Sequence, residues 1–340
     1  MGPHPKRVTR IPLKETELES SASHNSLPIR IGISRCLLGE AVRYDGGHKR
    51  DRFVTEVLSR HVEWVPICPE VEAGFGTPRE AMRLVGDAKK PQLITVTTER
   101  NLTKPLTLYT GQKLETLAQV HLSGYIFKKD SPSCGIERVK LFNPQGMPSR
   151  AGVGLFARAF SERFPLVPIE DEGRLCDPVL RDNFIERVFC YHRWQLLSQR
   201  PSSRQSIVVF HTIHKYLLLA HSREVYQALG RLVAQAHRYK PKELVERYGT
   251  LFMKALAVKA TRRKQVNVLQ HLVGHLKEQL RPKERMELND VIAEYHQGLV
   301  PLIVPITLIK HYVTMYEVGY IQDQIYLTPH PKELMLRNYV

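Results

Sequence analysis

The hydrophobic pattern changes character near residue 172, and this change most constrains the fold of the 340-residue chain. Before it, short apolar or β-branched runs alternate with segments whose apolar residues recur at helical spacing. After it, from about Arg181 onward, the pattern is helical throughout. Strands that alternate with helices typically form a mostly parallel sheet with helices on both faces. We therefore predict a Rossmann-like α/β region followed by an all-α C-terminal domain.

The α/β region is expected to contain five strands and three helices. The predicted strands are Pro28–Ser34, Glu63–Ile67, Gln92–Thr97, Gly124–Lys128 and Leu166–Ile169, and the predicted helices are Asp51–Val62, Gly111–His121 and Val153–Arg163.

Length and composition favour two domains. We predict a polar leader at 1–27 with no apolar signal region, a first domain at 28–172 and a basic helical domain at 173–340. No apolar run is long enough to span a bilayer, so we expect a cytoplasmic chain with no membrane partner.

The formal charge of +16 is concentrated in the helical part, where residues 191–340 hold 22 Lys and Arg against 11 Asp and Glu. Such a balance favours a polyanionic partner, with nucleic acid ahead of a membrane surface. One segment of eleven residues contains five cations and no acid. These cations, which we predict to contact nucleic acid, are Lys254, Lys259, Arg262, Arg263 and Lys264. Alternatively, they form ordinary solvated helix faces.

The chain has five cysteines, an odd number, and none is spaced as CxxC. Reduced thiols are therefore expected in place of a disulfide framework. Three of them, Cys36, Cys68 and Cys134, each follow a predicted strand. Cys190 lies in a helical stretch and is expected in the core, whereas Cys176 could reach the same sheet edge as a fourth thiol.

Because ligands of parallel α/β sheets bind outside the carboxyl ends of the strands, these three cysteines can converge on one site. Three thiolates can hold a [4Fe–4S] cluster with one iron open, and they could also hold zinc with an open position. Because a cluster needs thiolates and no histidine except His48 shares these motifs, we favour the cluster and keep zinc as the alternative.

Polar residues near these cysteines are candidates for the chemistry. Glu70, two residues after Cys68, could act as a general acid or base, and Ser131 could hydrogen-bond to a substrate or to cluster sulfur. Each also has a structural reading, as a solvated carboxylate or as a turn cap. The candidate substrate-binding residues are Ser34, Asp45, Arg79, Lys128 and Ser133; Asp45 would otherwise make a tight turn, and the two cations would be surface charges.

Three motifs together, SRCLLG with VRYDG, CPE with TPRE, and SPSCG, resemble the bacterial thiouracil and thiouridine desulfidase family. The resemblance covers roughly residues 28–172, and the helical remainder is similar to the YbgA-type domain often fused behind it. No departure from the family pattern occurs at the named residues.

The resemblance implies a [4Fe–4S] cluster held by Cys36, Cys68 and Cys134, with Glu70 and Ser131 assisting. It also implies a hydrolytic reaction in which water replaces the sulfur of a thiocarbonyl and hydrosulfide leaves. Within the family, the chain resembles the two-domain desulfidases proposed to remove sulfur from 4-thiouridine in tRNA. The basic helical domain fits a tRNA partner.

Three alternatives remain. One is a salvage desulfidase for free thiouracil or thionucleotides. A second is sulfur insertion into tRNA, which is disfavoured because the chain has neither a GxxxxGK[ST] loop nor an SGGxDS-type loop for ATP chemistry. The third is a non-catalytic RNA-binding protein with structural zinc.

Overall fold

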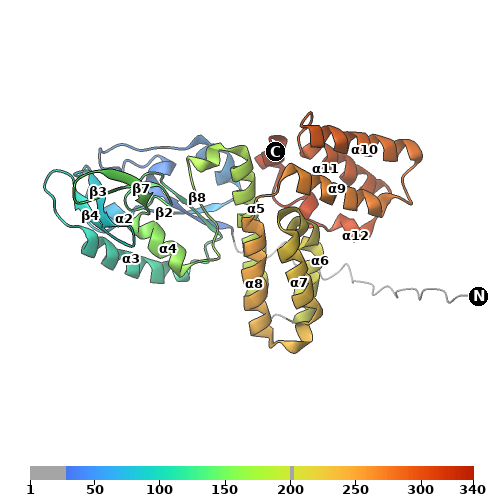
Figure 1. The fold of residues 1–340 in the computed structure, drawn as a ribbon, viewed down its shortest axis with the longest axis horizontal. Helices are drawn as coiled ribbons and strands as arrows, with labels where there is room; N and C mark the ends of the chain where they lie inside the picture. The colour runs from blue at the N-terminus through green and yellow to red at the C-terminus, as the bar shows by residue number, and fades with distance from the viewer. Residues whose placement is uncertain (1–27, 200–202) are drawn as a thin grey trace, which may run out of the picture.

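A computed structural model describes residues 28–199 and 203–340 (Figure 1). It confirms an α/β region with parallel strands followed by an all-helical region. The predicted leader at 1–27 lies outside the described residues. No helix in the described part of the chain is long and apolar enough to cross a membrane.

The first sheet of the α/β region has the strand order β2-β1-β5-β8 and is parallel throughout. The chain passes from β1 to β2 on one side and later places β5 on the other side of β1. The carboxyl ends of these central strands therefore flank a topological switch point, where such sheets bind ligands. The strands are β1 (Arg30–Ser34), β2 (Glu63–Ile67), β5 (Gly124–Phe127) and β8 (Ile169–Asp171).

Alternating residues of this sheet enter two cores. Ile31 and Ile33 of β1 pack with α5 (Pro178–Ser198), whereas Tyr125 and Phe127 of β5 pack with α3 (Thr103–Ala118) and α4 (Leu155–Arg163) on the opposite face. Gly32 is needed between them, because a Cβ there would lie 2.3 Å from the Tyr125 ring. The predicted helices on both faces are thus present.

A second sheet, in the order β4-β3-β6-β7, was not anticipated. Three of its strands escaped prediction: β6 has only four residues, β7 is almost wholly exposed, and β3 ends in exposed residues. The segment predicted as a strand at Gln92–Thr97 lies largely in β4, which pairs antiparallel with β3 in this sheet. The strands are β3 (Met82–Asp87), β4 (Lys90–Thr95), β6 (Val139–Phe142) and β7 (Pro148–Gly152).

The helical region packs around one large apolar cluster, which includes Leu244, Tyr248, Phe252 and Leu256 of one helix. Helices α6 to α8 form one group beside α5, and α9 to α12 form another (Figure 1). The helices are α6 (Arg204–His221), α7 (Arg223–Ala234), α8 (Pro241–Ala257), α9 (Arg262–Leu276), α10 (Pro282–Gln297), α11 (Ile303–Met315) and α12 (Gly319–Gln322).

Helix α5 joins the two regions, because its residues enter both cores. Phe184 and Val188 pack beneath the first sheet, while Cys190 and Trp194 belong to the helical core. The end of the chain returns to the same place, where Leu334 and Leu336 pack in the cluster that holds β1 and Cys36. The loop of Cys36 is therefore packed against elements from both ends of the chain.

A buried ionic cluster stabilises this junction. Glu186 of α5 pairs with His221 of α6 and accepts a bond from Arg337 at 3.2 Å, and all three side chains are buried. Burial opposes the charges, but the mutual attraction outweighs it and holds the pKa of Glu186 below and that of His221 above the ordinary values. Arg337 also donates to the carbonyl of Tyr326 at 2.6 Å.

We expect Arg337→Leu to lower the free energy of unfolding by about 3–5 kcal/mol, because it leaves a buried carboxylate with one charged partner. Arg281→Leu is the matched control, since Arg281 lies 78% exposed in its ion pair and is expected to cost less than about 1 kcal/mol. Denaturant unfolding monitored by circular dichroism measures both. Equal, small effects would show that the buried cluster does not hold the junction.

Candidate active site

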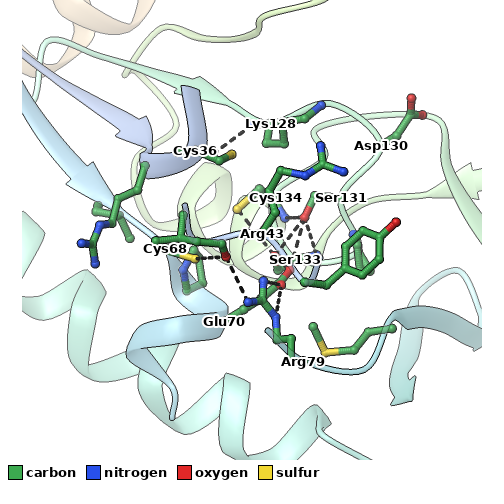
Figure 2. A pocket seen from close by; sticks show the side chains of 18 of the residues that line it. Cys36, Arg43, Cys68, Glu70, Arg79, Lys128, Asp130, Ser131, Ser133 and Cys134 are labelled. Carbon is green, nitrogen blue, oxygen red and sulfur yellow. Dashed lines mark hydrogen bonds and ion pairs between the residues drawn. The ribbon is translucent and has the colours of Figure 1, made fainter. Parts of the chain in front are cut away.

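Three loops at the carboxyl edge of the first sheet meet around one cavity of about 390 Å³. Cys36 lies in the 3₁₀ turn (Arg35–Leu38) after β1, Cys68 directly follows β2, and Cys134 lies in the loop after β5. All three line the cavity, as Figure 2 shows. The sequence prediction that these cysteines converge is therefore met.

The three thiols are buried, with the cysteines 7%, 9% and 4% exposed in chain order. Burial raises the pKa of Cys36 to about 11 and also raises the pKa values of Cys68 and Cys134. At neutral pH the thiols are thus protonated unless a cation displaces their protons. Such thiols suit a metal centre better than a free nucleophile.

The cysteines line the walls of a cavity instead of meeting at one point. Among residues 28–199 and 203–340, no three His, Cys, Asp or Glu side chains are close enough to hold one metal ion. A tetrahedral zinc site needs all its ligands within about 2.0–2.3 Å of the ion. The buried thiol donors around the cavity match the thiolates that iron–sulfur clusters require.

Glu70 lies at the same cavity with both carboxylate oxygens engaged (Figure 2). It lies in the short helix α2 (Pro69–Glu72), which begins directly after Cys68. One oxygen accepts a bond from Ser133 Oγ at 2.5 Å and a longer one from Ser131 Oγ at 3.5 Å. The other accepts a bond from Arg79 Nε at 2.9 Å. Glu70 is therefore an oriented, buried hydrogen-bond acceptor next to the three thiols.

The two serines connect this carboxylate to the third cysteine. Ser131 and Ser133 share a hydrogen bond of 3.0 Å, and Ser131 Oγ accepts the backbone N–H of Cys134 at 3.1 Å. Ser133 Oγ lies 3.6 Å from Cys134 Sγ. The SPSCG loop therefore couples Glu70 to Cys134, and Ser131 Oγ caps the turn by accepting the N–H groups of Ser133 and Cys134.

Three other predicted residues that line the cavity have structural tasks here. Arg79, besides its bonds to Glu70, donates to the carbonyls of Val42 and Gly76, so its side chain ties two loops together. Lys128 lines the cavity but pairs with Glu172. Ser34 lines it and accepts the N–H of Lys128 at 2.9 Å.

Asp45 does not line the cavity. It is exposed, closes a turn by accepting the N–H of Gly47 at 3.1 Å, and pairs with Arg43, which does line the cavity. This matches the simpler interpretation of Asp45 as a turn residue. Asp45 would affect a substrate in the cavity only by positioning the Arg43 guanidinium with which it pairs.

The sequence analysis missed Glu72. Its carboxylate accepts the backbone N–H of Cys68 at 2.9 Å, Tyr109 Oη at 2.5 Å and Lys113 Nζ at 2.9 Å. Tyr109 and Lys113 belong to α3, so Glu72 links that helix to the cysteine. Glu72 is the last residue of α2, and the local sequence does not mark it, because two of its partners, Tyr109 and Lys113, are distant in the chain.

The remaining cysteines lie away from the cavity. Cys190 is buried in the helical core, as expected. Cys176 is exposed, and its Sγ lies 3.5 Å from the carbonyl of Glu172. It is not among the residues that line the cavity.

The five cations of the predicted basic segment differ in their exposure to solvent. Lys254 near the end of α8, Lys259 in the connection, and Arg262 and Arg263 at the start of α9 are exposed. Lys264 is half-buried and donates to the carbonyl of His221 at 2.6 Å. Four of the five cations can therefore reach an external partner, whereas Lys264 stabilises the fold.

Comparison with known proteins assigns the region around the cavity to a protein family. The family model described as 2-thiouracil desulfurase matches residues 31–172. The uncharacterized protein YbbK of Bacillus subtilis (strain 168) is 32% identical over 111 residues, which cover 30% of this chain and 71% of that protein. The chain belongs to the 2-thiouracil desulfurase family.

The helical region matches a second family model, a protein of unknown function (DUF1722), over residues 215–331. The uncharacterized protein YbgA of Escherichia coli (strain K12) is 29% identical over 158 residues, covering 46% of this chain and 94% of that protein. A solved structure of a [4Fe-4S]-dependent thiouracil desulfidase, TudS, is 25% identical with a TM-score of 0.36, and covers 43% of this chain and 93% of that one.

Every residue that lines the cysteine cavity lies between Ser34 and Cys134, within the 2-thiouracil desulfurase match. The cavity is therefore a feature of the desulfurase-family region, and the helical region contributes no residue to its lining.

A double-mutant cycle tests the hydrogen-bond network around Glu72. Burial and the bond to Glu72 raise the pKa of Tyr109, so its hydroxyl remains a donor. We expect Glu72→Gln and Tyr109→Phe to be coupled by about 1–2 kcal/mol in the free energy of unfolding. The control cycle pairs Glu72→Gln with Tyr44→Phe, because Tyr44 is exposed on the cavity rim. Coupling below about 0.3 kcal/mol in both cycles would contradict the network.

Proposed function

We propose that this chain is a [4Fe–4S]-dependent desulfidase that converts 4-thiouridine in tRNA to uridine and releases hydrosulfide. The observation that carries the proposal is the meeting of three buried cysteines, from three separate strand ends, around a cavity that also contains Glu70. Membership in the 2-thiouracil desulfurase family supports the reaction class. Free thiols and an oxygen-sensitive centre fit a cytoplasmic enzyme.

Cys36, Cys68 and Cys134 would hold the cluster, and the bound cluster would supply a Lewis-acidic iron for the thiocarbonyl sulfur of the substrate. The reaction is a hydrolysis with no net redox change. Water adds its oxygen to the ring carbon, the carbon–sulfur bond breaks, and the sulfur leaves as hydrosulfide.

Glu70 is proposed to take up the proton of the attacking water. Both of its oxygens accept hydrogen bonds, so it is oriented as an acceptor. Arg79 holds the carboxylate in place, and Ser131 and Ser133 complete a chain of hydroxyls that leads to Cys134. In this arrangement Ser131 can pass a proton toward the departing sulfur or the ring nitrogen.

The preference for tRNA over a free base is supported by the charge of the helical domain. A free thiouracil needs only the cavity, and a net charge of +11 over residues 191–340 would then have no task. Exposed cations at Lys254, Lys259 and Arg263 can contact phosphates. Salvage of free thiouracil or thionucleotides is the alternative, and the experiment below separates the two.

The first experiment is anaerobic reconstitution of the full chain with iron and sulfide, followed by incubation with thiolated tRNA. We expect loss of the thiouridine absorbance with a matching release of hydrosulfide. Turnover of free thiouracil without turnover of tRNA would replace this proposal with the salvage activity.

We expect Cys36→Ala, Cys68→Ala and Cys134→Ala each to lose most of the bound iron and its visible absorbance, because each removes one of three ligands. Cys176→Ala is the matched control, since Cys176 is exposed outside the cavity, and it should load iron normally. Glu70→Gln should load iron but lose turnover. A cavity-cysteine variant with full iron and activity would refute the three-ligand arrangement.

We expect the triple change Lys254→Ala, Lys259→Ala and Arg263→Ala to weaken tRNA binding and to reduce the slope of log affinity against log salt by about one per cation. The control replaces Lys277, Lys283 and Arg285 with alanine, because these residues are also exposed cations of the helical region. Filter binding at several salt concentrations measures the effect. Equal slopes for the two triple variants would show that the first three cations have no special role.

A further inference from the structure

The C-terminal segment, residues 329–340, returns to the α/β region, and Figure 1 shows the end of the chain beside α5. Four residues of α5 contact it: Asp182, Glu186, Phe189 and Arg193. These residues are three or four positions apart, so they share one face of the helix. One face of α5 is therefore given to the C-terminal segment.

Ion pairs and hydrogen bonds fix the segment to this face. Asp182 Oδ1 lies 3.1 Å from His330 Nε2, and Arg193 donates to the carbonyl of Pro329 at 2.6 Å. Arg337 adds its ion pair with the buried carboxylate of α5 at 3.2 Å. His330 and Arg337 are both buried, so these contacts are shielded from water. The segment is thus held at several points along α5.

Two leucines of the segment enter the apolar cluster that contains the Cys36 turn. Leu334 and Leu336 are buried, whereas Met335 between them is exposed and has a φ of +52°. Left-handed backbone is uncommon in a residue other than glycine, so the chain makes a defined turn at Met335. The cluster that receives both leucines also contains Cys36 and the fully buried Leu37.

Cys36 is held in a different way from the other two cysteines of the cavity. Glu72 accepts the backbone N–H of Cys68, and Ser131 accepts that of Cys134. Cys134 also packs among apolar residues, but in a cluster on the opposite face of the first sheet. Packing by the C-terminal segment therefore supports Cys36 and does not extend to the clusters and bonds that hold Cys68 and Cys134.

We infer that the C-terminal segment is a positioning element of the cysteine cavity. Leu334 and Leu336 keep the Cys36 turn packed, so that its thiol stays buried and in place beside the other two. Removal of buried leucine side chains leaves a void that neighbours fill only in part, and the turn would then open more often. The consequence for cluster binding rests on the proposed function. The segment lies mostly beyond the residues that the two family models match, which end at 172 and 331.

Alkylation of the metal-free full chain by iodoacetamide, measured at each cysteine by peptide mass spectrometry, tests this inference. A buried thiol reacts only when its surroundings open, so its rate reports local stability. In the double variant Leu334→Ala and Leu336→Ala, we expect Cys36 to react about tenfold faster, and Cys134 less than about twofold faster. Cys176 is exposed and should react equally in all variants, which controls for the reagent.

Leu272→Ala is the matched control, because Leu272 is fully buried in the helical core and lies outside the Cys36 cluster. It should leave the ratio of the Cys36 rate to the Cys134 rate unchanged. Leu336→Val is a milder change that is expected to fold, and it should raise this ratio to a smaller extent than the double variant does. An unchanged ratio in both leucine variants, or an equal rise at all three cavity cysteines, would overturn the inference.

Iron retention connects this packing to the cluster. Each variant is reconstituted anaerobically and mixed with EDTA, and the loss of visible absorbance is followed. We expect the double variant to lose iron faster than the Leu272→Ala variant. Equal retention in the two would contradict a positioning role. Failure of the unsubstituted chain to load iron would instead overturn the proposed function, while the alkylation rates would still decide whether the segment positions Cys36.

Discussion

The order of three parallel strands is the constraint on which the rest of the structure depends. Because β1 lies between β2 and β5 in a parallel sheet, the loops that follow all three strands begin at the same edge of the sheet. Each loop carries one cysteine, and the pairing brings together thiols that are distant in the chain. Packing against both faces of the sheet keeps these thiols buried, and burial makes them resist ionisation until a cation binds.

The polar groups around the cavity show how so many buried charges and hydroxyls are accommodated. Two carboxylates from one short helix have separate tasks: Glu70 faces the cavity and is held by Arg79, while Glu72 turns to the backbone of Cys68 and to α3. Buried polar groups are tolerated only when their hydrogen bonds are made. The network therefore fixes the orientation of the cysteine loops at the same time as it positions a proton acceptor.

The helical region is attached through shared packing instead of a flexible connection. Helix α5 contributes to both cores, and the C-terminal segment returns to the cluster around β1 and Cys36. The buried charges of Glu186, His221 and Arg337 close this junction. The helical region is therefore fixed to the α/β region through α5 and the C-terminal segment.

The sequence alone determined the elements whose signals are local. Hydrophobic periodicity identified β1, β2 and β5 and the helical character of the second half, but it placed the fourth strand of the first sheet at Leu166–Ile169 instead of Ile169–Asp171. The position of each cysteine after a strand identified the candidate ligands. Periodicity did not reveal β3, β6 and β7, because β6 has only four residues, β7 is almost wholly exposed and β3 ends in exposed residues. Only the tertiary structure decided which cations are free. Arg79, Lys128 and Lys264 are engaged by groups distant in sequence, and an ion pair depends on spatial neighbours that a residue's own segment does not specify.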